Sequence, residues 1–185
     1  SVAGAPYDTM QEVIGTAGDH TTKEDSLIAH GVLYEEIPLL NDTDIDFQKL
    51  EQSIDKTVTM VLIQRSKGYS TRKSLSIETI EKICKIVKSK NPDCICFVDN
   101  CYGEFVDSKE PLEVGADLIA GSLIKNPGGG IVEAGGYIAG KAKWVEKSAN
   151  RLTAPGIGSE GGAMFNQHRL MFQGLFMAPS VVCLS

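Results

Sequence analysis

Two short apolar runs, each followed by a chemically reactive residue, most constrain the fold of this sequence. Residues 95–98 lead directly into Asp99, and the apolar residues 118–120 are followed five positions later by Lys125. Continuous apolar runs of this length are typical of strands that are buried on both faces of a parallel sheet. In open α/β sheets, ligands bind just beyond the carboxyl ends of such strands. The pattern therefore predicts a site at one edge of a sheet that contains Asp99 and Lys125.

Apolar strands alternate with amphipathic helices along the rest of the chain. Strand–helix alternation predicts an α/β fold, with a mostly parallel sheet and helices on both faces. We see no internal repeat and no linker, so the chain is interpreted as one domain or part of one. The predicted helices are 8–14, 23–30, 46–55, 76–90, 142–152 and 163–175, with a short one near Glu113, and the predicted strands are 32–39, 58–64, 94–98, 118–122 and 136–139.

Size and charge exclude several classes of function. The chain has 185 residues, enough for one domain with a core of its own, and a net charge of −6. This negative charge, without a cluster of Lys and Arg interleaved with aromatic residues, argues against nucleic acid as the main partner. No apolar run reaches the length of a membrane span, and the first residues do not resemble a secretion signal. We therefore expect a soluble, cytoplasmic protein that binds neither nucleic acid nor membrane.

Metal and nucleotide sites find little support in the sequence. The five cysteines are odd in number and match no zinc spacing, and the three histidines are scattered. We interpret the cysteines as buried, reduced thiols. Residues 135–141 fit the pattern G-x-x-x-x-G-K, but Ala142 stands where a phosphate-binding loop needs Ser or Thr. The sequence therefore predicts neither a metal site nor a P-loop.

A lysine and an aspartate at neighbouring strand ends suit one cofactor well, pyridoxal 5'-phosphate (PLP). Its aldehyde forms a Schiff base with a lysine amine, and its ring nitrogen needs an anionic partner. Lys125 and Asp99 could fill these two roles. Two structural interpretations compete with them: Lys125 as a solvated lysine at a strand end, and Asp99 as the cap of the turn that follows it.

Four segments of the chain resemble the PLP-dependent sulfur-amino-acid lyases, the group that includes cystathionine β-lyase and methionine γ-lyase. The similarity is greatest to a divergent branch known as methionine γ-lyase-like or aluminium-resistance proteins. The segments are VLIQRSKGY at 61–69, FVDNCYGEF at 97–105, SLIKNPGGG at 122–130 and RLTAPGIG at 151–158. They occur in the family's order, so together they support the family more strongly than they support any one substrate.

The resemblance implies a fold and roles for individual residues. It implies the large domain of an aspartate-aminotransferase-like (fold type I) enzyme, of which residues 1–185 would be the central, PLP-binding part. Lys125 would form the Schiff base with PLP and move the α-proton of the substrate, and Asp99 would hold the ring nitrogen. Ser122 would donate to the cofactor phosphate, and Tyr102 would flank the cofactor. Many typical lyases carry Ser or Thr directly before the lysine, where this chain has Ile124.

Three further residues follow the predicted strand 58–64 at the same edge of the sheet. They are Arg65, Tyr69 and Arg72. An arginine at this position could bind the carboxylate of a substrate or the phosphate of a cofactor with two parallel hydrogen bonds. The alternative interpretation is ordinary surface charge.

The implied activity is a carbon–sulfur lyase that eliminates a thiol from the β or γ carbon of a sulfur amino acid. The alternatives are another PLP reaction on the same fold, such as transamination, and a non-catalytic interaction module or inactive fragment. Members of the family are longer, so we expect this chain to be the middle of a larger, homo-oligomeric protein (dimer or tetramer). The phosphate-binding glycine turn, an amino-terminal tyrosine, a substrate-side arginine and a carboxy-terminal small domain are expected outside it.

Overall fold

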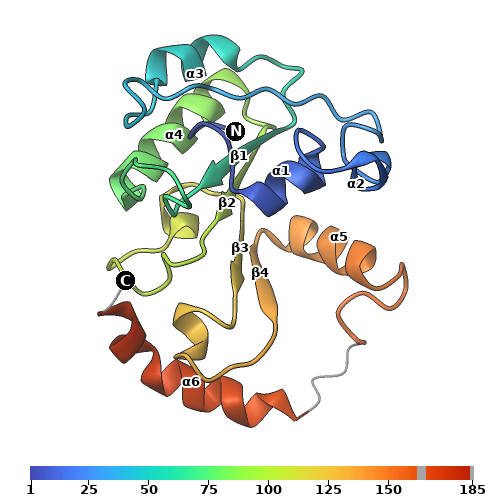
Figure 1. The fold of residues 1–185 in the computed structure, drawn as a ribbon, viewed down its shortest axis with the longest axis vertical. Coiled ribbons are helices and arrows are strands. Elements are labelled where there is room, and N and C mark those ends of the chain that lie inside the picture. Colours follow the sequence, from blue (N-terminus) through green and yellow to red (C-terminus); the bar gives the residue numbers. More distant parts are fainter. Residues whose placement is uncertain (162–165, 184–185) are drawn as a thin grey trace.

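A four-stranded sheet forms the centre of the molecule (Figure 1). The computed structural model describes residues 1–161 and 166–183. The strands lie side by side in the order β1 (Met60–Gln64), β2 (Ile95–Asp99), β3 (Leu118–Ser122) and β4 (Gly136–Gly140). β1, β2 and β3 run parallel, whereas β4 runs antiparallel to β3. The predicted α/β class with a mostly parallel sheet is therefore confirmed.

Helices connect and flank these strands. The α-helices of the described residues are α1 (Asp8–Ile14), α2 (His20–Glu24), α3 (Phe47–Ser53), α4 (Ile77–Lys90), α5 (Ala142–Leu152) and α6 (Gln167–Val182), with short 3₁₀ turns η1 (Pro111–Val114) and η2 (Asn126–Gly128). Two capping side chains explain where helices begin. Asp46 accepts a hydrogen bond from the N–H of Lys49 before α3, and Ser76 accepts one from the N–H of Thr79 before α4. Such caps satisfy N–H groups that have no partner inside the helix.

The core lies between α4 and the sheet. Ile80, Ile83 and Val87 form a stripe along α4 and are completely buried. Ile63 of β1 and Val98 of β2 are also completely buried and belong to the same cluster. Full burial of each such side chain contributes about 1.5–3 kcal/mol. This packing fixes the sheet, and with it the ends of its strands.

The second face of the sheet is covered less fully. α5 lies on the opposite side of the strands from α4 (Figure 1). Along β2, Cys96 and Val98 are buried, whereas Ile95 and Phe97 are half-buried. None of the residues of α5, all of which the structure describes, is buried. Helices therefore occur on both sides, as predicted, but only the α4 side is a closed core.

The helix predicted at 23–30 is wrong in position. The structure has a shorter helix, α2, at His20–Glu24, and residues 25–31 form turns. The reason is local, because the side chain of Asp19 accepts a hydrogen bond from the N–H of Thr22 and starts the helix early.

The strand predicted at 32–39 is also wrong. The segment is extended, but it joins none of the strands of the described sheet. Its N–H at Ile37 donates to the carbonyl of Ser1 at 2.9 Å. Leu33 is 98% exposed, so the apolar residues of this segment do not share a buried face. An apolar run alone does not make a strand when no neighbouring edge pairs with it.

The last predicted helix is longer than expected. Of the predicted range 163–175, residues 163–165 lie outside the described residues. From Gln167, α6 continues to Val182 and includes Pro179, although a proline removes one helical hydrogen bond. α6 packs closely on η2, since a Cβ added at Gly174 would collide with the backbone of Gly128. The loop after Lys125 is therefore packed against α6.

A buried ion cluster at the amino end of β3 was not predicted. Asp117 is only 2% exposed. Its carboxylate accepts from Lys88 of α4 at 2.6 Å and from Lys141, next to β4, at 2.5 Å. It also accepts the N–H of Cys96 in β2 at 2.8 Å. One carboxylate thus joins three elements of the fold.

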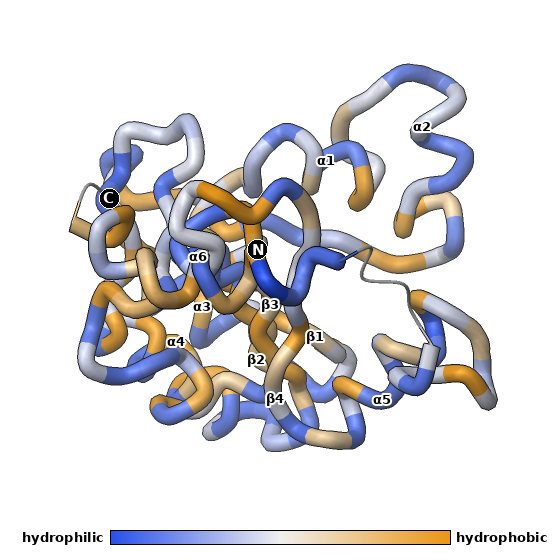
Figure 2. Tube along the Cα trace, turned by 90° about the horizontal axis from the view of Figure 1, so that it is seen from below, coloured by the Kyte–Doolittle hydropathy of each residue, from blue (hydrophilic) through white to orange (hydrophobic). Residues whose placement is uncertain are grey.

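Apolar residues are concentrated at the centre of the molecule. Figure 2 shows the hydrophobic colours along the central strands and mostly hydrophilic colours around α2.

Among the described residues, none of the helices combines the length and the hydrophobicity that a membrane crossing requires.

Candidate active site

The carboxyl ends of the three parallel strands meet at one edge of the sheet. Gln64 of β1 lies opposite Asp99 of β2, and Asp99 lies opposite Ala120 of β3. Just beyond this register, the N–H of Arg65 donates to the carbonyl of Asp99 at 3.0 Å, and the N–H of Asn100 donates to the carbonyl of Ala120 at 2.8 Å. The residues that follow the strands are therefore neighbours, as the sequence predicts.

Lys125 lies three residues beyond the end of β3 and is half-buried. Its Nζ lies 4.3 Å from the centroid of the Tyr102 ring, a distance at which a cation is attracted to the ring face. Burial lowers the pKa of Lys125, but a hydrogen bond with the Cys101 thiol and the charges of Cys101, Tyr102 and Asp99 outweigh it. The net result is a raised pKa. Lys125 is therefore a cation at neutral pH in this structure, held beside an aromatic ring.

Asp99 is the last residue of β2 and is half-buried. Its Oδ1 accepts the N–H of Cys101 at 3.0 Å, so the aspartate caps the turn that follows the strand. Its charge also acts on Lys125 and raises the pKa of that amine. The carboxylate therefore caps the turn and acts electrostatically on Lys125, and its role toward a ring nitrogen stays a prediction.

Tyr102 lies between Asp99 and Lys125 and has an unusual backbone. Its φ of 65° is left-handed, as is the φ of 64° at Phe105. Left-handed conformations are unfavourable for bulky residues and occur where surrounding structure imposes them. The Tyr102 side chain is 53% exposed, so its ring is open to a ligand on the side away from the protein.

Ser122 ends β3 and is half-buried. Its Oγ accepts the N–H of Ile124 at 3.4 Å, a long contact within the turn that leads to Lys125. The hydroxyl hydrogen is free to point elsewhere, since this contact uses only the oxygen. Ser122 therefore shapes the turn and still carries a donor at the strand end.

Arg65 is buried inside the protein, with 3% of its surface exposed. Its Nη1 donates to Oδ1 of Asn100 at 2.9 Å and to the carbonyl of Gly103 at 2.8 Å. Its Nη2 pairs with Asp107 at 2.6 Å, and Glu110 lies at 3.6 Å. These contacts occupy the guanidinium. The geometry favours a role in supporting the loop after β2 over binding of a carboxylate or phosphate.

Arg72 and Tyr69 lie in the loop after β1 in contrasting surroundings. Arg72 is 2% exposed, and its guanidinium donates to the carbonyls of Gln64, Ser66 and Lys73. Burial lowers the pKa of Arg72. Tyr69 is 89% exposed. Arg72 therefore fixes the backbone of the loop, while Tyr69 projects from it.

Tyr7 joins the site although the sequence analysis missed it. Burial raises the pKa of Tyr7, and the nearby charges of Asp99 and Cys101 raise it further against the opposing effect of Lys125. Its N–H donates to Oε1 of Gln64 at 2.9 Å, which anchors the start of α1 at the end of β1. Position 7 looked like nothing more than the lead-in to a helix, and the family's amino-terminal tyrosine was expected outside the chain. The tertiary fold alone brings Tyr7 to the strand ends.

Lys125 lines neither of two hollows on the described surface. One hollow of about 260 Å³ lies beside Glu78 and Asp107, and an apolar one of about 500 Å³ lies beside Phe172 and Phe176 of α6. We place the site by its chemistry, because neither hollow brings a nucleophile together with a carboxylate from a second strand end. The structure thus shows the strand-end residues of the candidate site.

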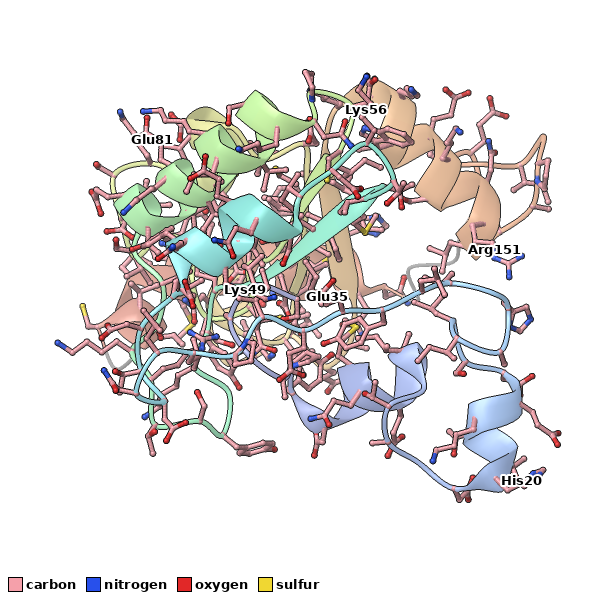
Figure 3. All side chains as sticks on the ribbon, turned by 90° about the horizontal axis from the view of Figure 1, so that it is seen from above. His20, Glu35, Lys49, Lys56, Glu81 and Arg151 are labelled. Atoms are coloured by element: carbon pink, nitrogen blue, oxygen red, sulfur yellow. The ribbon has the colours of Figure 1, made fainter. Side chains whose placement is uncertain are left out.

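Metal binding finds no support in the described part of the chain, where no group of three His, Cys, Asp or Glu side chains could hold an ion. His20 lies at the outer end of α2, at the edge of the molecule, where it pairs with Glu24 at 3.2 Å (Figure 3). The groups at the strand ends are instead an amine, a carboxylate and aromatic rings. This donor set fits PLP, whose aldehyde, ring nitrogen and flat ring need those three partners.

Comparisons with known proteins show which family the chain resembles. The model of the family described as methionine gamma-lyase matches residues 1–185. The protein YnbB of Bacillus subtilis, whose function is uncharacterised, is 47% identical over 181 residues, which are 98% of this chain and 42% of YnbB. The crystal structure of a carbon-sulfur lyase involved in aluminium resistance from Clostridium novyi NT is 48% identical, with a TM-score of 0.90 over 98% of this chain and 43% of that one.

Two further structures represent high and low sequence identity to this chain. A Listeria monocytogenes protein, whose name assigns it provisionally to the cystathionine beta-lyases and to aluminium resistance, is 48% identical with a TM-score of 0.91 over 98% of this chain and 45% of that one. A cystathionine gamma-lyase from Lactobacillus plantarum is 20% identical with a TM-score of 0.55 over 73% of this chain and 33% of that one, and it shares the fold alone. The chain spans about half the length of the curated relatives it matches. By its sequence and its fold, the chain belongs to the methionine gamma-lyase family.

Proposed function

We propose that the complete protein is a PLP-dependent carbon–sulfur lyase that acts on a sulfur amino acid. The observation that carries the proposal is that Lys125 and Asp99 come from the ends of adjacent strands, with the lysine amine 4.3 Å from the Tyr102 ring and its pKa raised in part by the Asp99 charge. The Clostridium novyi relative, named a carbon-sulfur lyase, supports the reaction class.

Each residue of the site has a role in this proposal. Lys125 holds the cofactor through its ε-amine and, once released from it, moves the proton at the α-carbon of the substrate. Asp99 keeps a proton on the ring nitrogen through its negative charge. Tyr7 and Tyr102 supply aromatic surface on which a flat ring can rest. Ser122 offers a hydroxyl to the cofactor phosphate.

When bound, PLP supplies an electron sink that lets an amino acid lose its α-proton and then a thiol. The protein must supply a base for that proton at a fixed place. A lysine is a base only when its amine is neutral, whereas the raised pKa of Lys125 keeps it charged in this structure. Its engagement with the cofactor therefore has to take the amine out of the contacts with Cys101 and Asp99 that favour the charged form.

Thiol release tests the reaction class. The complete protein would be incubated with PLP and either cystathionine or methionine, and the thiol would be measured with a thiol reagent. We expect thiol from the wild type and from Lys67→Ala, a control at an exposed lysine, and no thiol from Lys125→Ala. Formation of a keto acid without thiol would show transamination and would contradict the lyase assignment.

A further inference from the structure

Glu104 is a buried carboxyl group that the proposed reaction does not use. The residue is 3% exposed. Its Oε1 accepts a hydrogen bond from the Tyr137 hydroxyl at 2.9 Å, and its Oε2 has no hydrogen-bond partner within the described residues. An unpaired polar atom is costly to bury, so such a group is retained where it does something else.

Glu104 contacts the chain on both sides of Lys125. Before the lysine, Gly121 of β3 lies against the Glu104 carboxyl and the Tyr137 ring so closely that an added Cβ would collide with both. After the lysine, the side-chain amide of Asn126 donates to the backbone carbonyl of Glu104 at 3.1 Å. Asn126 is completely buried. Glu104 thus contacts the turn that carries Lys125 both before the lysine, at Gly121, and after it, at Asn126.

The same network reaches Asp99. The Tyr137 hydroxyl that donates to Glu104 accepts a hydrogen bond from the side-chain amide of Asn100 at 3.3 Å. Asn100 directly follows Asp99, and its Oδ1 accepts from the buried Arg65. The positions of the amine and of the carboxylate are therefore joined through buried hydrogen bonds.

The pKa of the Glu104 carboxyl is raised in this setting. Burial raises the pKa of Glu104, and the Glu110 charge adds to the increase, while hydrogen bonds from its own backbone and from Tyr137 and the charge of Lys125 oppose it without cancelling it. A raised pKa favours the neutral form of the acid, which adds no second negative charge to the one on Asp99. Two further charged groups adjoin this network: Arg65 donates to Asn100 and pairs with Asp107, and Glu110 accepts from the Asn100 amide at 3.0 Å.

We propose that Glu104 is a positioning residue that clamps the Lys125 turn, through Tyr137 and Gly121 on one side and Asn126 on the other, so that the amine stays beside Cys101 and Tyr102. The role rests on the proposed function of Lys125, but it concerns the lysine of the protein without cofactor. Removing the Glu104 side chain should free the start of the turn, at Gly121 and Tyr137, whereas the backbone carbonyl of residue 104 still accepts from Asn126. The amine should then lose the contacts that raise its pKa and become more reactive.

The test measures the reactivity of Lys125 directly. The complete protein, stripped of cofactor, would be treated with acetic anhydride at a series of pH values. The acetylation rate of Lys125 would be measured by mass spectrometry relative to that of Lys56, an exposed lysine at the edge of the molecule (Figure 3). The variants are Glu104→Ala and Tyr137→Phe. The control is Glu133→Gln, which makes the acid-to-amide change at an exposed position.

We expect Glu104→Ala to raise the relative rate for Lys125 about tenfold at neutral pH, because a lower pKa leaves more of the amine in its neutral, reactive form. Tyr137→Phe should raise it in the same direction by a smaller factor, since it removes only the hydroxyl that holds the carboxyl. Glu104→Gln should stay near the wild-type rate, because the amide oxygen still accepts from Tyr137. Glu133→Gln should leave it unchanged.

A purely structural role for Glu104 would lower the melting temperature and leave the relative rate and pH profile of Lys125 as in the wild type. That result, in Glu104→Ala or in a folded Tyr137→Phe if the alanine variant does not fold, would overturn the proposal. The measurement needs no cofactor and no substrate. If the complete protein releases no thiol but Glu104→Ala changes the acetylation rate of Lys125, the lyase assignment is refuted and the role of Glu104 stands. If thiol is released but the acetylation rate does not change, the lyase assignment stands and the role of Glu104 is refuted.

Discussion

The two ends of β3 use charged residues in opposite ways. At the amino end, the Asp117 carboxylate is buried and paired with Lys88 and Lys141. At the carboxyl end, Lys125 is half-buried, lies over the Tyr102 ring and is only partly balanced by Asp99. Backbone strain follows the same division, because the left-handed Tyr102 and Phe105 both lie at the carboxyl end. At the amino end, charged groups hold strands and helices together. At the carboxyl end, charged groups remain accessible.

Under the proposed function, the contrast separates residues that stabilise the fold from residues that react. A buried carboxylate that joins three elements stabilises the sheet without offering anything to a ligand. A half-buried amine and carboxylate at the ends of neighbouring strands stabilise little but remain available for chemistry. Substitutions at the two ends should therefore have opposite signatures, and four variants test this, from the largest expected effect to the smallest.

Lys125→Ala should have the largest effect on activity and little effect on stability. We expect turnover in the complete protein to fall on the order of 10⁴-fold, the upper range for loss of a catalytic acid–base group. The melting temperature should stay close to that of the wild type, because the lysine has no buried ion-pair partner among the described residues. A stability loss as large as that of an Asp117 variant would break the comparison.

Asp99→Asn keeps the shape of the side chain and removes its charge. The amide oxygen can still accept the N–H of Cys101, so the turn should remain. Turnover should fall roughly 10²–10³-fold, on the scale of one lost electrostatic contact to a developing charge. Near-normal turnover would place the partner of the ring nitrogen elsewhere.

Asp117→Asn should show the reverse signature, with full activity per folded molecule and lower stability. We expect the free energy of unfolding to fall by about 2 kcal/mol, the value of hydrogen bonds to a charged group. Urea denaturation at neutral pH measures it, with Asp93→Asn as an exposed control. A loss of turnover without a loss of stability would contradict the division between the two ends.

The same residue gives a pH dependence. Burial raises the pKa of Asp117, but the hydrogen bonds from Lys141, Lys88 and the N–H of Cys96 prevail, and the pKa lies below its ordinary value of 3.8. A lowered folded-state pKa stabilises the protein above the unfolded-state value, and this stabilisation is lost as the pH falls through the folded-state pKa. Below about pH 4, the stability difference between the wild type and Asp117→Asn should therefore shrink.

Arg65→Lys should have the smallest effect and sharpens the boundary between the two ends. Arg65 lies at the carboxyl end but is buried among Asn100, Gly103 and Asp107. Lysine keeps the charge and loses the planar fork. We expect a loss of about 1 kcal/mol in unfolding free energy and an unchanged KM for the substrate. A large rise in KM with normal stability would show that Arg65 binds the substrate carboxylate after all.

Local signals in the sequence were enough to predict part of this structure. Asp99 and Lys125 were found because each follows an apolar run, and parallel strands bring their carboxyl ends together. The starts of α3 and α4 lie within one residue of the predicted starts, and there Asp46 and Ser76 cap N–H groups three residues away. Information of this kind lies within one turn or one strand of the residue concerned.

The rest depends on contacts between distant segments. Tyr7 reaches the site through Gln64, 57 positions along the chain, and Arg65 is buried by Asp107, 42 positions away. The clamp at Glu104 uses Tyr137, 33 positions away. No spacing or periodicity in the sequence indicates such pairs. Only the fold shows that Arg65 is buried and that Tyr7 lies at the site.

Covalent capture of the cofactor tests the central claim most directly, namely that the carboxyl end of the sheet is a PLP site built on Lys125. The complete protein would be mixed with PLP, reduced with borohydride and digested, and the modified lysine would be located by mass spectrometry. We expect one stable adduct, on Lys125, and none in Lys125→Ala. An adduct on Lys67 or Lys141, with Lys125 unmodified, would contradict the account.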